Sequence, residues 1–229
     1  LMFAFYVYGG NPNCDSQVLL KLLSMDCKPT QINYYNDSAL ELAFKFYGEN
    51  PNCDSTVLLK LLEIYCESEY ISIDKNVLMY AFEYYGQNPN CDSQVLLKLL
   101  DMDYIEEYES RRSQTILMCA FQYYCSNPNC DSAILLKLLD TGCNLVLSDM
   151  EHKTALMHAF QYYGSNPNCD SAVFFKILDM DCNLKYCNGY YDNAFVYAFQ
   201  YYGLNQNCES TVLLILLDMD YKPDYECID

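Results

Sequence analysis

Tryptophan is absent from this 229-residue sequence, histidine occurs only twice, and basic residues are scarce. Thirteen Lys and Arg stand against 31 Asp and Glu, which gives a formal net charge of −18. Nucleic acids and anionic membranes are bound through Lys and Arg, so we expect neither as a partner. No apolar run approaches the roughly 20 residues that cross a bilayer. No basic segment followed by an apolar one opens the chain, so a secretory signal is not expected either.

The sequence also lacks the usual motifs of catalysis and cofactor binding. It contains no Gly-rich phosphate loop, no serine-centred nucleophile elbow and no C-x-x-C pair of the kind that binds zinc. The Asn11–Ser16 string follows calcium-loop spacing but has one formal charge and no glutamate at the bidentate position. We therefore predict a protein that is not an enzyme and that has no metal, no cofactor and no small-molecule substrate.

Internal repetition is the dominant feature that is present. The string NPNCDS begins at five positions and returns once as NQNCES, in steps of 38 or 39 residues, at Asn11, Asn50, Asn88, Asn127, Asn166 and Asn205. We number these copies 1 to 6 and call each string an NPN loop. Because they cover essentially the whole chain, they predict a single repeat array over residues 1–229. The predicted units are approximately 1–32, 33–71, 72–109, 110–148, 149–187 and 188–229.

Each copy is predicted to form a helix, a loop and a second helix. In copy 5, Leu156, Ala159, Phe160 and Tyr163 fall on one face of a helix. Residues suited to N-capping precede the first helices, at Ser38, Asn76, Thr115, Thr154 and Asn193. A glycine follows most first helices, at Gly48, Gly86, Gly164 and Gly203, where we expect a left-handed C-terminal residue. Copy 4 has Cys125 there, which would be strained in that backbone conformation.

Fourteen cysteines are present, and six occupy the same position in the NPN loop. Equivalent positions of stacked helices lie about 8–10 Å apart, whereas a disulfide needs Cα atoms within about 7 Å. We therefore predict reduced cysteines and a cytoplasmic or nuclear location, including the cytoplasm of a host cell. The same separation argues against a nucleophile–base pair between Cys119 and His158, which are one repeat apart. A cysteine enzyme would also need a lowered thiol pKa.

These helices resemble a known family. Thr154-Ala155-Leu156-Met157-His158-Ala159 is similar to the T-P-L-H-x-A signature of ankyrin repeats, and residues 134–144 resemble that family's second helix and closing turn. The resemblance implies an all-α, ankyrin-type solenoid of six repeats with irregular connector tips. A period of about 39 instead of 33 residues implies a lengthened inter-helix loop, as in ankyrin proteins of large DNA viruses. A generic α-solenoid of paired helices is the structural alternative.

The resemblance also implies a function, because ankyrin repeats bind proteins through their concave face and connector tips. We expect the residue before the alanine of each first helix to point there. We call this the pre-alanine position, and the predicted partner-binding residues at it are Leu42, Tyr80, Cys119, His158 and Tyr197. Connector tyrosines, Tyr108, Tyr190 and Tyr191, complete the predicted binding set. Paired tyrosines such as Tyr84 and Tyr85 are instead predicted to pack between repeats.

The predicted function is therefore a non-enzymatic scaffold for protein–protein interaction. The acidic charge predicts a basic patch on its protein partner. The alternative is a passive spacer or oligomerisation array within a longer protein. Copy 1 lacks a polar cap, so Leu1, Met2 and Phe5 are expected to expose apolar surface, which favours a longer parent chain.

Overall fold

The computed structural model describes residues 1–25, 31–67, 75–102, 114–180, 182, 184 and 186–219. The chain divides into two compact units, Leu1–Tyr108 and Glu109–Asp229, and each is described by itself. The predicted single array and its six unit boundaries stay predictions.

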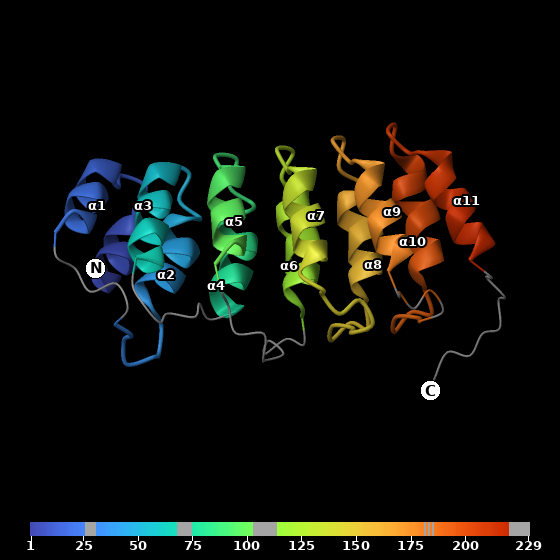
Figure 1. Cartoon of the computed structure of the whole chain (residues 1–229), viewed down its shortest axis with the longest axis horizontal. Coiled ribbons are helices and arrows are strands. Elements are labelled where there is room, and N and C mark those ends of the chain that lie inside the picture. The colour runs from blue at the N-terminus through green and yellow to red at the C-terminus, as the bar shows by residue number, and fades with distance from the viewer. Residues whose placement is uncertain are drawn as a thin grey trace. The chain divides into compact units, whose positions relative to one another are not determined.

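The described residues of the first unit form α-helices and short π-helices, which are labelled η (Figure 1). In chain order they are η1 (Ala4–Gly9), α1 (Ser16–Leu23), α2 (Ala39–Leu42), η2 (Ala43–Tyr47), α3 (Ser55–Cys66), α4 (Lys75–Tyr80), η3 (Ala81–Tyr85) and α5 (Ser93–Leu100). The second helices contact one another in the order α1, α3, α5, and the π-helical segments contact in the order η1, η2, η3.

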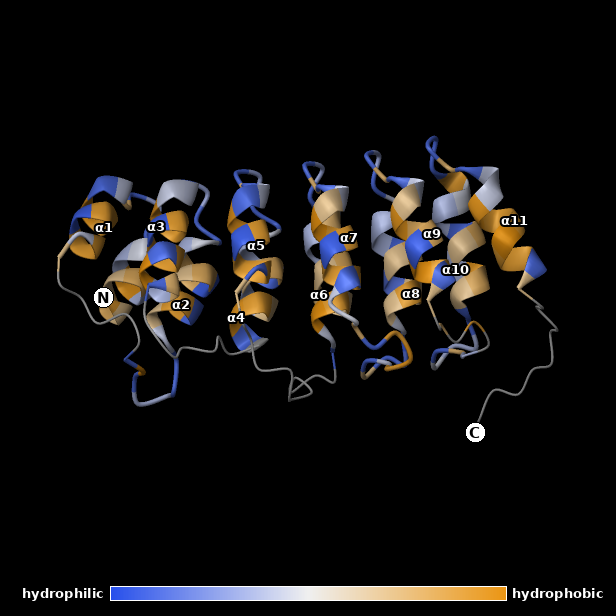
Figure 2. Ribbon diagram, viewed as in Figure 1, coloured by the Kyte–Doolittle hydropathy of each residue, from blue (hydrophilic) through white to orange (hydrophobic). Residues whose placement is uncertain are grey.

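The second unit repeats this layout. Its elements are α6 (Ile116–Gln122), η4 (Tyr124–Ser126), α7 (Ser132–Asp140), α8 (Ala155–His158), η5 (Ala159–Tyr163), α9 (Ser171–Asp179), α10 (Ala194–Gln200), η6 (Tyr202–Leu204) and α11 (Ser210–Asp218). Here η4 and η6 are 3-10 helices and η5 is a π-helix. First helices contact in the order α6, α8, α10 and second helices in the order α7, α9, α11. Two layers of helices thus result, and hydrophobic residues make up much of these helices (Figure 2).

The all-α prediction is confirmed. Within the described ranges no strand forms, and the β-type pairing is limited to three isolated bridges in the connectors. No helix of the described part is long and apolar enough to cross a membrane. The core holds a phenylalanine from each of copies 1 to 5, and all five are fully buried: Phe5, Phe44, Phe82, Phe121 and Phe160. The expectation that Phe5 exposes apolar surface is therefore wrong, because η2 of the next copy covers η1.

Four of the five predicted N-caps are confirmed. The side chains of Ser38, Thr115, Thr154 and Asn193 each accept a hydrogen bond from the backbone N–H three residues later. Such a bond satisfies one of the amides that a first helical turn leaves without a partner. The fifth residue, Asn76, lies inside α4, which begins at Lys75.

The prediction of left-handed glycines after the first helices is wrong. Gly48, Gly86 and Gly164 have right-handed backbone angles, with φ between −59° and −60°. Gly164 is needed for space instead, because a Cβ there would lie 2.3 Å from the carbonyl oxygen of Phe160 and 3.0 Å from Cβ of Tyr202. Copy 4, which has Cys125 at this position, has no π-helix there but α6 followed by the 3-10 helix η4, and copy 6 has the same arrangement with Gly203.

The NPN loops form a ladder of hydrogen bonds between successive copies. In the first unit, Nδ2 of Asn50 donates to the carbonyl oxygens of Gly9 and Asn11, both at 2.7 Å. In the second unit, Nδ2 of Asn166 donates to the carbonyl oxygens of Cys125 at 2.7 Å and Asn127 at 2.9 Å. The second asparagine of the loop adds another rung, as from Asn52 Nδ2 to the Pro12 carbonyl at 2.6 Å. This ladder explains why the loop is copied almost unchanged.

Other residues of the loop fix its start and its end. The last tyrosine before each loop accepts a hydrogen bond from the backbone N–H at the loop's acidic residue, as Tyr163 does from Asp170 at 2.9 Å. The aspartate then caps the second helix, as Asp170 does by accepting from the N–H of Ala172. The two asparagines, the proline carbonyl and the aspartate of the NPN loop thus each have a structural role.

Candidate functional site: the connector tips and the pocket at His158

Three connectors each form a hairpin of the same kind, which we call the tip hairpin. It comprises residues 32–38, 148–154 and 187–193, and an isolated β-bridge closes each. In the second of these, Oδ1 of Asp149 accepts from the backbone N–H groups of Glu151 at 2.8 Å and Lys153 at 2.9 Å. Asn33 and Asn188 make the same two bonds in the other hairpins. A short polar side chain that accepts from nearby amides is typical of a tight turn.

Each tip hairpin contains one residue with a positive φ, at Asn36, His152 or Tyr191. This conformation turns the backbone sharply, so the residues at the apex project outward. Tyr190 is 81% exposed and Tyr191 is 66% exposed, and Tyr34 and Tyr35 of the first hairpin are likewise exposed. Aromatic side chains therefore stand at the ends of the first and third hairpins.

The second and third hairpins are anchored to the first helix that follows them. Oδ2 of Asp149 lies 2.9 Å from Nε2 of His158, and both side chains are buried. In the next copy, Nδ2 of Asn188 donates to the hydroxyl oxygen of Tyr197 at 2.9 Å. The pre-alanine residues His158 and Tyr197 thus hold the tip hairpins in place.

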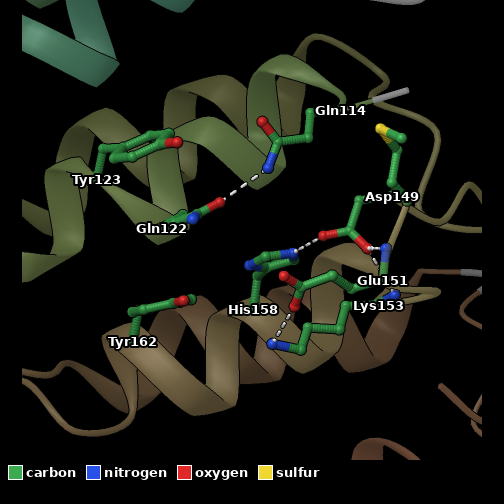
Figure 3. A pocket seen from close by; sticks show the side chains of 9 residues that line it. Gln114, Gln122, Tyr123, Asp149, Glu151, Lys153, His158 and Tyr162 are labelled. Carbon is green, nitrogen blue, oxygen red and sulfur yellow. Dashed lines mark hydrogen bonds and ion pairs between the residues drawn. The ribbon is translucent and has the colours of Figure 1, made fainter. Parts of the chain in front are cut away.

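A pocket of about 290 Å³ lies beside this anchor, between α6 and the segment α8–η5 (Figure 3). Its lining residues are Gln114, Gln122, Tyr123, Asp149, Met150, Glu151, Lys153, His158 and Tyr162. Its size is at the lower limit of the about 300–1,000 Å³ that is usual for small-molecule sites.

The pocket contains hydrogen-bond acceptors of two kinds. Nδ1 of His158 is buried and makes no hydrogen bond to the residues that the structure describes. Asp149 is a carboxylate that accepts from His158 and from two amides. In the tautomer whose Nε2 donates to Asp149, Nδ1 carries the lone pair and can accept from an incoming group. The ring of Tyr162 stacks on His158 with centroids 5.7 Å apart.

Hydrogen bonds and an ion pair position the charged side chains of the pocket. Burial raises the pKa of Asp149, but the hydrogen bonds from His158 and from the amides of Lys153 and Glu151 outweigh burial and lower it below its ordinary value. Lys153 pairs with Glu151 at 2.9 Å. Its pKa is lowered by burial but raised overall by that glutamate. Besides His158, the ionisable acids and bases of the lining are thus two carboxylates, Asp149 and Glu151, and one ammonium, Lys153.

The predicted exposure of the pre-alanine residues is wrong for four of them. Leu42, Cys119, His158 and Tyr197 are buried, because the first helices and the tip hairpins cover them. Tyr80 is half-buried and packs against Tyr84, with the two rings tilted at 54° and their centroids 5.8 Å apart. A partner-binding role for any of these five residues stays a prediction.

The connector tyrosines differ among themselves. Tyr190 and Tyr191 are exposed, as a binding surface requires, whereas Tyr108 lies outside the described residues. The two members of each tyrosine pair differ in burial. The second member of each pair is fully buried, as at Tyr85, while the first is half-buried, as at Tyr84.

Sequence reasoning missed the pairing of Asp149 with His158. His158 was considered as a partner-binding residue and as a possible base for Cys119, but not as a partner of Asp149. A signal was nevertheless present in the sequence. Asp149 and Asn188 each stand nine positions before a polar pre-alanine residue, His158 and Tyr197 respectively. The spacing alone does not show that the hairpin folds back onto the helix.

Five cysteines lie in surroundings that suppress thiolate formation. Burial raises the pKa of the Cys14, Cys53, Cys125, Cys169 and Cys208 thiols, to about 12 for Cys169. A nucleophilic cysteine needs the opposite shift. Among the described residues, no group of three or more His, Cys, Asp or Glu side chains is placed to hold a metal ion.

Comparison with solved structures identifies the fold. An ankyrin repeat domain from Acinetobacter baumannii superposes with a TM-score of 0.55 at 14% identity, covering 94% of this chain and 97% of that one. A chain in the structure of a predatory endopeptidase from Bdellovibrio bacteriovorus with its immunity protein gives a TM-score of 0.52 at 15% identity, with the same coverage. No protein-family model and no curated protein matches the sequence. The class of the molecule is thus an all-α helical-repeat protein, and its particular fold is that of ankyrin repeat domains.

Proposed function

We propose that this chain is a non-enzymatic scaffold that binds a partner protein through its first helices and tip hairpins. The pocket at His158 is the central contact of this proposal, and the group it takes is a Lys or Arg side chain of the partner. The observation that carries the proposal is the buried, unpartnered Nδ1 of His158 beside the carboxylates of Asp149 and Glu151. A buried acceptor without a donor is costly, so a donor from a partner is favoured.

Three features of the pocket favour a cation over other donors. Two carboxylates and one ammonium line it, and Asp149 stays ionised because its pKa is lowered. The half-buried rings of Tyr123 and Tyr162 line the same space, and aromatic faces attract cations. The net charge of −18 also attracts a basic partner over longer distances and accelerates encounter.

Exposed aromatic residues near the pocket extend the contact area. Tyr190 and Tyr191 belong to the same unit as His158. Tyrosine is enriched in binding surfaces because its rigid ring adds contact area at low entropic cost. We propose no nucleic acid, membrane or small-molecule ligand for this surface. Reduced thiols further lead us to propose a cytoplasmic or nuclear location.

The proposal is tested with a display library of short peptides that contain a central Lys or Arg, or Gln at the same position. We expect the wild type to enrich the basic peptides, with weaker binding at high salt. Glu151→Lys and Tyr162→Ala should each reduce their affinity about tenfold or more, the loss of a contact worth about 1.4 kcal/mol.

Glu49→Lys is the matched control. It makes the same charge change at an exposed residue of the other unit, so it should leave most of the affinity in place. Equal enrichment of Gln peptides and basic peptides, or equal losses in Glu49→Lys and Glu151→Lys, would contradict the proposal.

A further inference from the structure

The outer face of copy 1 exposes a valine whose equivalent is buried in every later copy. Val18 of α1 is 44% exposed, whereas its equivalents in the second helices of copies 2 to 6 are fully buried: Val57, Val95, Ile134, Val173 and Val212. Phe3 and Val7 of the first helical segment are also exposed. In copies 2 to 6 this face packs against the preceding copy. In copy 1 the same face is exposed.

The outer face of copy 6 shows the opposite half of the same contact. Phe199 of α10 is 43% exposed, although the equivalent phenylalanine is fully buried in each earlier copy. Leu217 of α11 is 48% exposed, while its equivalent Leu178 is buried. This is the face that earlier copies turn toward the following copy.

Copy 6 is also more apolar than the copies before it. Ile215 stands where all five earlier copies have a lysine, and exposed Leu204 stands where they have Gly, Glu, Gln or Ser. Figure 2 shows α11 as predominantly hydrophobic. A terminal repeat that acts as a cap carries a polar outer face, and copy 6 has the reverse composition.

The hydrogen-bond ladder ends in complementary groups at the two outer faces. Asn11 and Asn13 occupy the positions from which Asn50 and Asn52 donate to the preceding copy. Gly203, Asn205 and Gln206 occupy the positions whose carbonyl oxygens accept from a following copy, as Gly164, Asn166 and Pro167 do from copy 6. Copy 1 thus offers donors, and copy 6 offers the matching acceptors.

We propose that copy 1 of one molecule stacks on copy 6 of a second molecule, so that the chain associates head to tail. The contact repeats the packing and the ladder that already join successive copies within each unit. Because the two faces differ, the interface is heterologous and assembly continues beyond a dimer unless the geometry closes a ring. Repulsion between molecules of charge −18 opposes the contact, so salt should promote it.

The test is sedimentation velocity of the full chain without any partner, from about 5 µM to about 500 µM. We expect the average mass to rise with concentration, and to rise further between about 0.05 M and about 0.5 M salt. Val18→Glu and Leu217→Glu should each remain monomeric. Val146→Glu, which makes the same substitution at an exposed position away from both outer faces, should associate like the wild type.

A mixture of the two monomeric variants decides the orientation. Val18→Glu retains an intact copy 6 and Leu217→Glu retains an intact copy 1, so the mixture should form a one-to-one dimer and nothing larger. A wild type that stays monomeric throughout, or a mixture that stays monomeric, would overturn the proposal. Loss of association in only one of the two variants would overturn it in favour of a symmetric contact.

Discussion

At the scale of single residues, Asp149 links the tip hairpin to the first helix of copy 5. Its carboxylate accepts from two amides and from His158, and its pKa is lowered in the folded state. A lowered pKa contributes stability above the unfolded value of about 3.9, and that contribution is lost as the pH falls through the folded pKa.

We predict that Asp149→Asn lowers the free energy of unfolding by about 1–3 kcal/mol at pH 7, because a charged hydrogen-bond acceptor is lost. The difference from the wild type should shrink as the pH falls below about 4. Urea unfolding at a series of pH values measures it. Asp179→Asn, at an exposed position, is the control. A difference that is constant from pH 7 to pH 3 would show that ionisation of Asp149 does not matter.

At the scale of elements, the NPN loop forms hydrogen bonds to the neighbouring copy as well as within its own copy. Asn166 donates to two carbonyl oxygens of copy 4 and accepts from the backbone N–H of Asn168. All these groups lie where the chain of copy 4 meets that of copy 5, and Asn166 itself is buried. Removing this side chain leaves two carbonyl oxygens and one amide without their partners.

We predict that Asn166→Ala lowers the free energy of unfolding by about 2–4 kcal/mol, since several buried polar groups lose a hydrogen bond. Asn168→Ala should cost about 1 kcal/mol or less, because its one bond to the Pro128 carbonyl is exposed. Chemical denaturation of both variants gives the comparison. Similar losses for the two would mean that the loop acts only as a local turn.

At the scale of the whole molecule, the charge of −18 is large for a chain of this length. Like charges repel one another across the folded surface, and salt screens that repulsion. We predict that the unfolding temperature rises by several degrees between about 0.05 M and about 0.5 M NaCl, since 1 kcal/mol corresponds to about 2–4 °C at this size. Calorimetry on dilute protein measures it.

A variant of lower charge serves as the control for this prediction. Glu49→Gln, Asp179→Asn and Asp218→Asn together change the formal charge from −18 to −15 at exposed positions. This triple variant should show a smaller rise with salt and a higher unfolding temperature at low salt. An unfolding temperature that falls with salt would contradict the role of self-repulsion.

The sequence by itself determined the features that short-range spacing encodes. A 3.6-residue hydrophobic period and capping residues at fixed offsets are properties of one segment, so the all-α fold and four N-caps could be predicted. The near-identity of the copies also indicated that they stack. The signature in residues 154–159 predicted an ankyrin-type fold, and the solved structures confirm that fold.

Only the tertiary structure decided which face each side chain meets. His158 and Tyr197 were predicted on the surface, but the tip hairpins fold back and bury them against Asp149 and Asn188. Gly164 was predicted to be left-handed, yet its small size serves the contact with Tyr202 one copy later. In each case the deciding atoms belong to another segment, so local pattern could identify the residue but could not determine its surroundings.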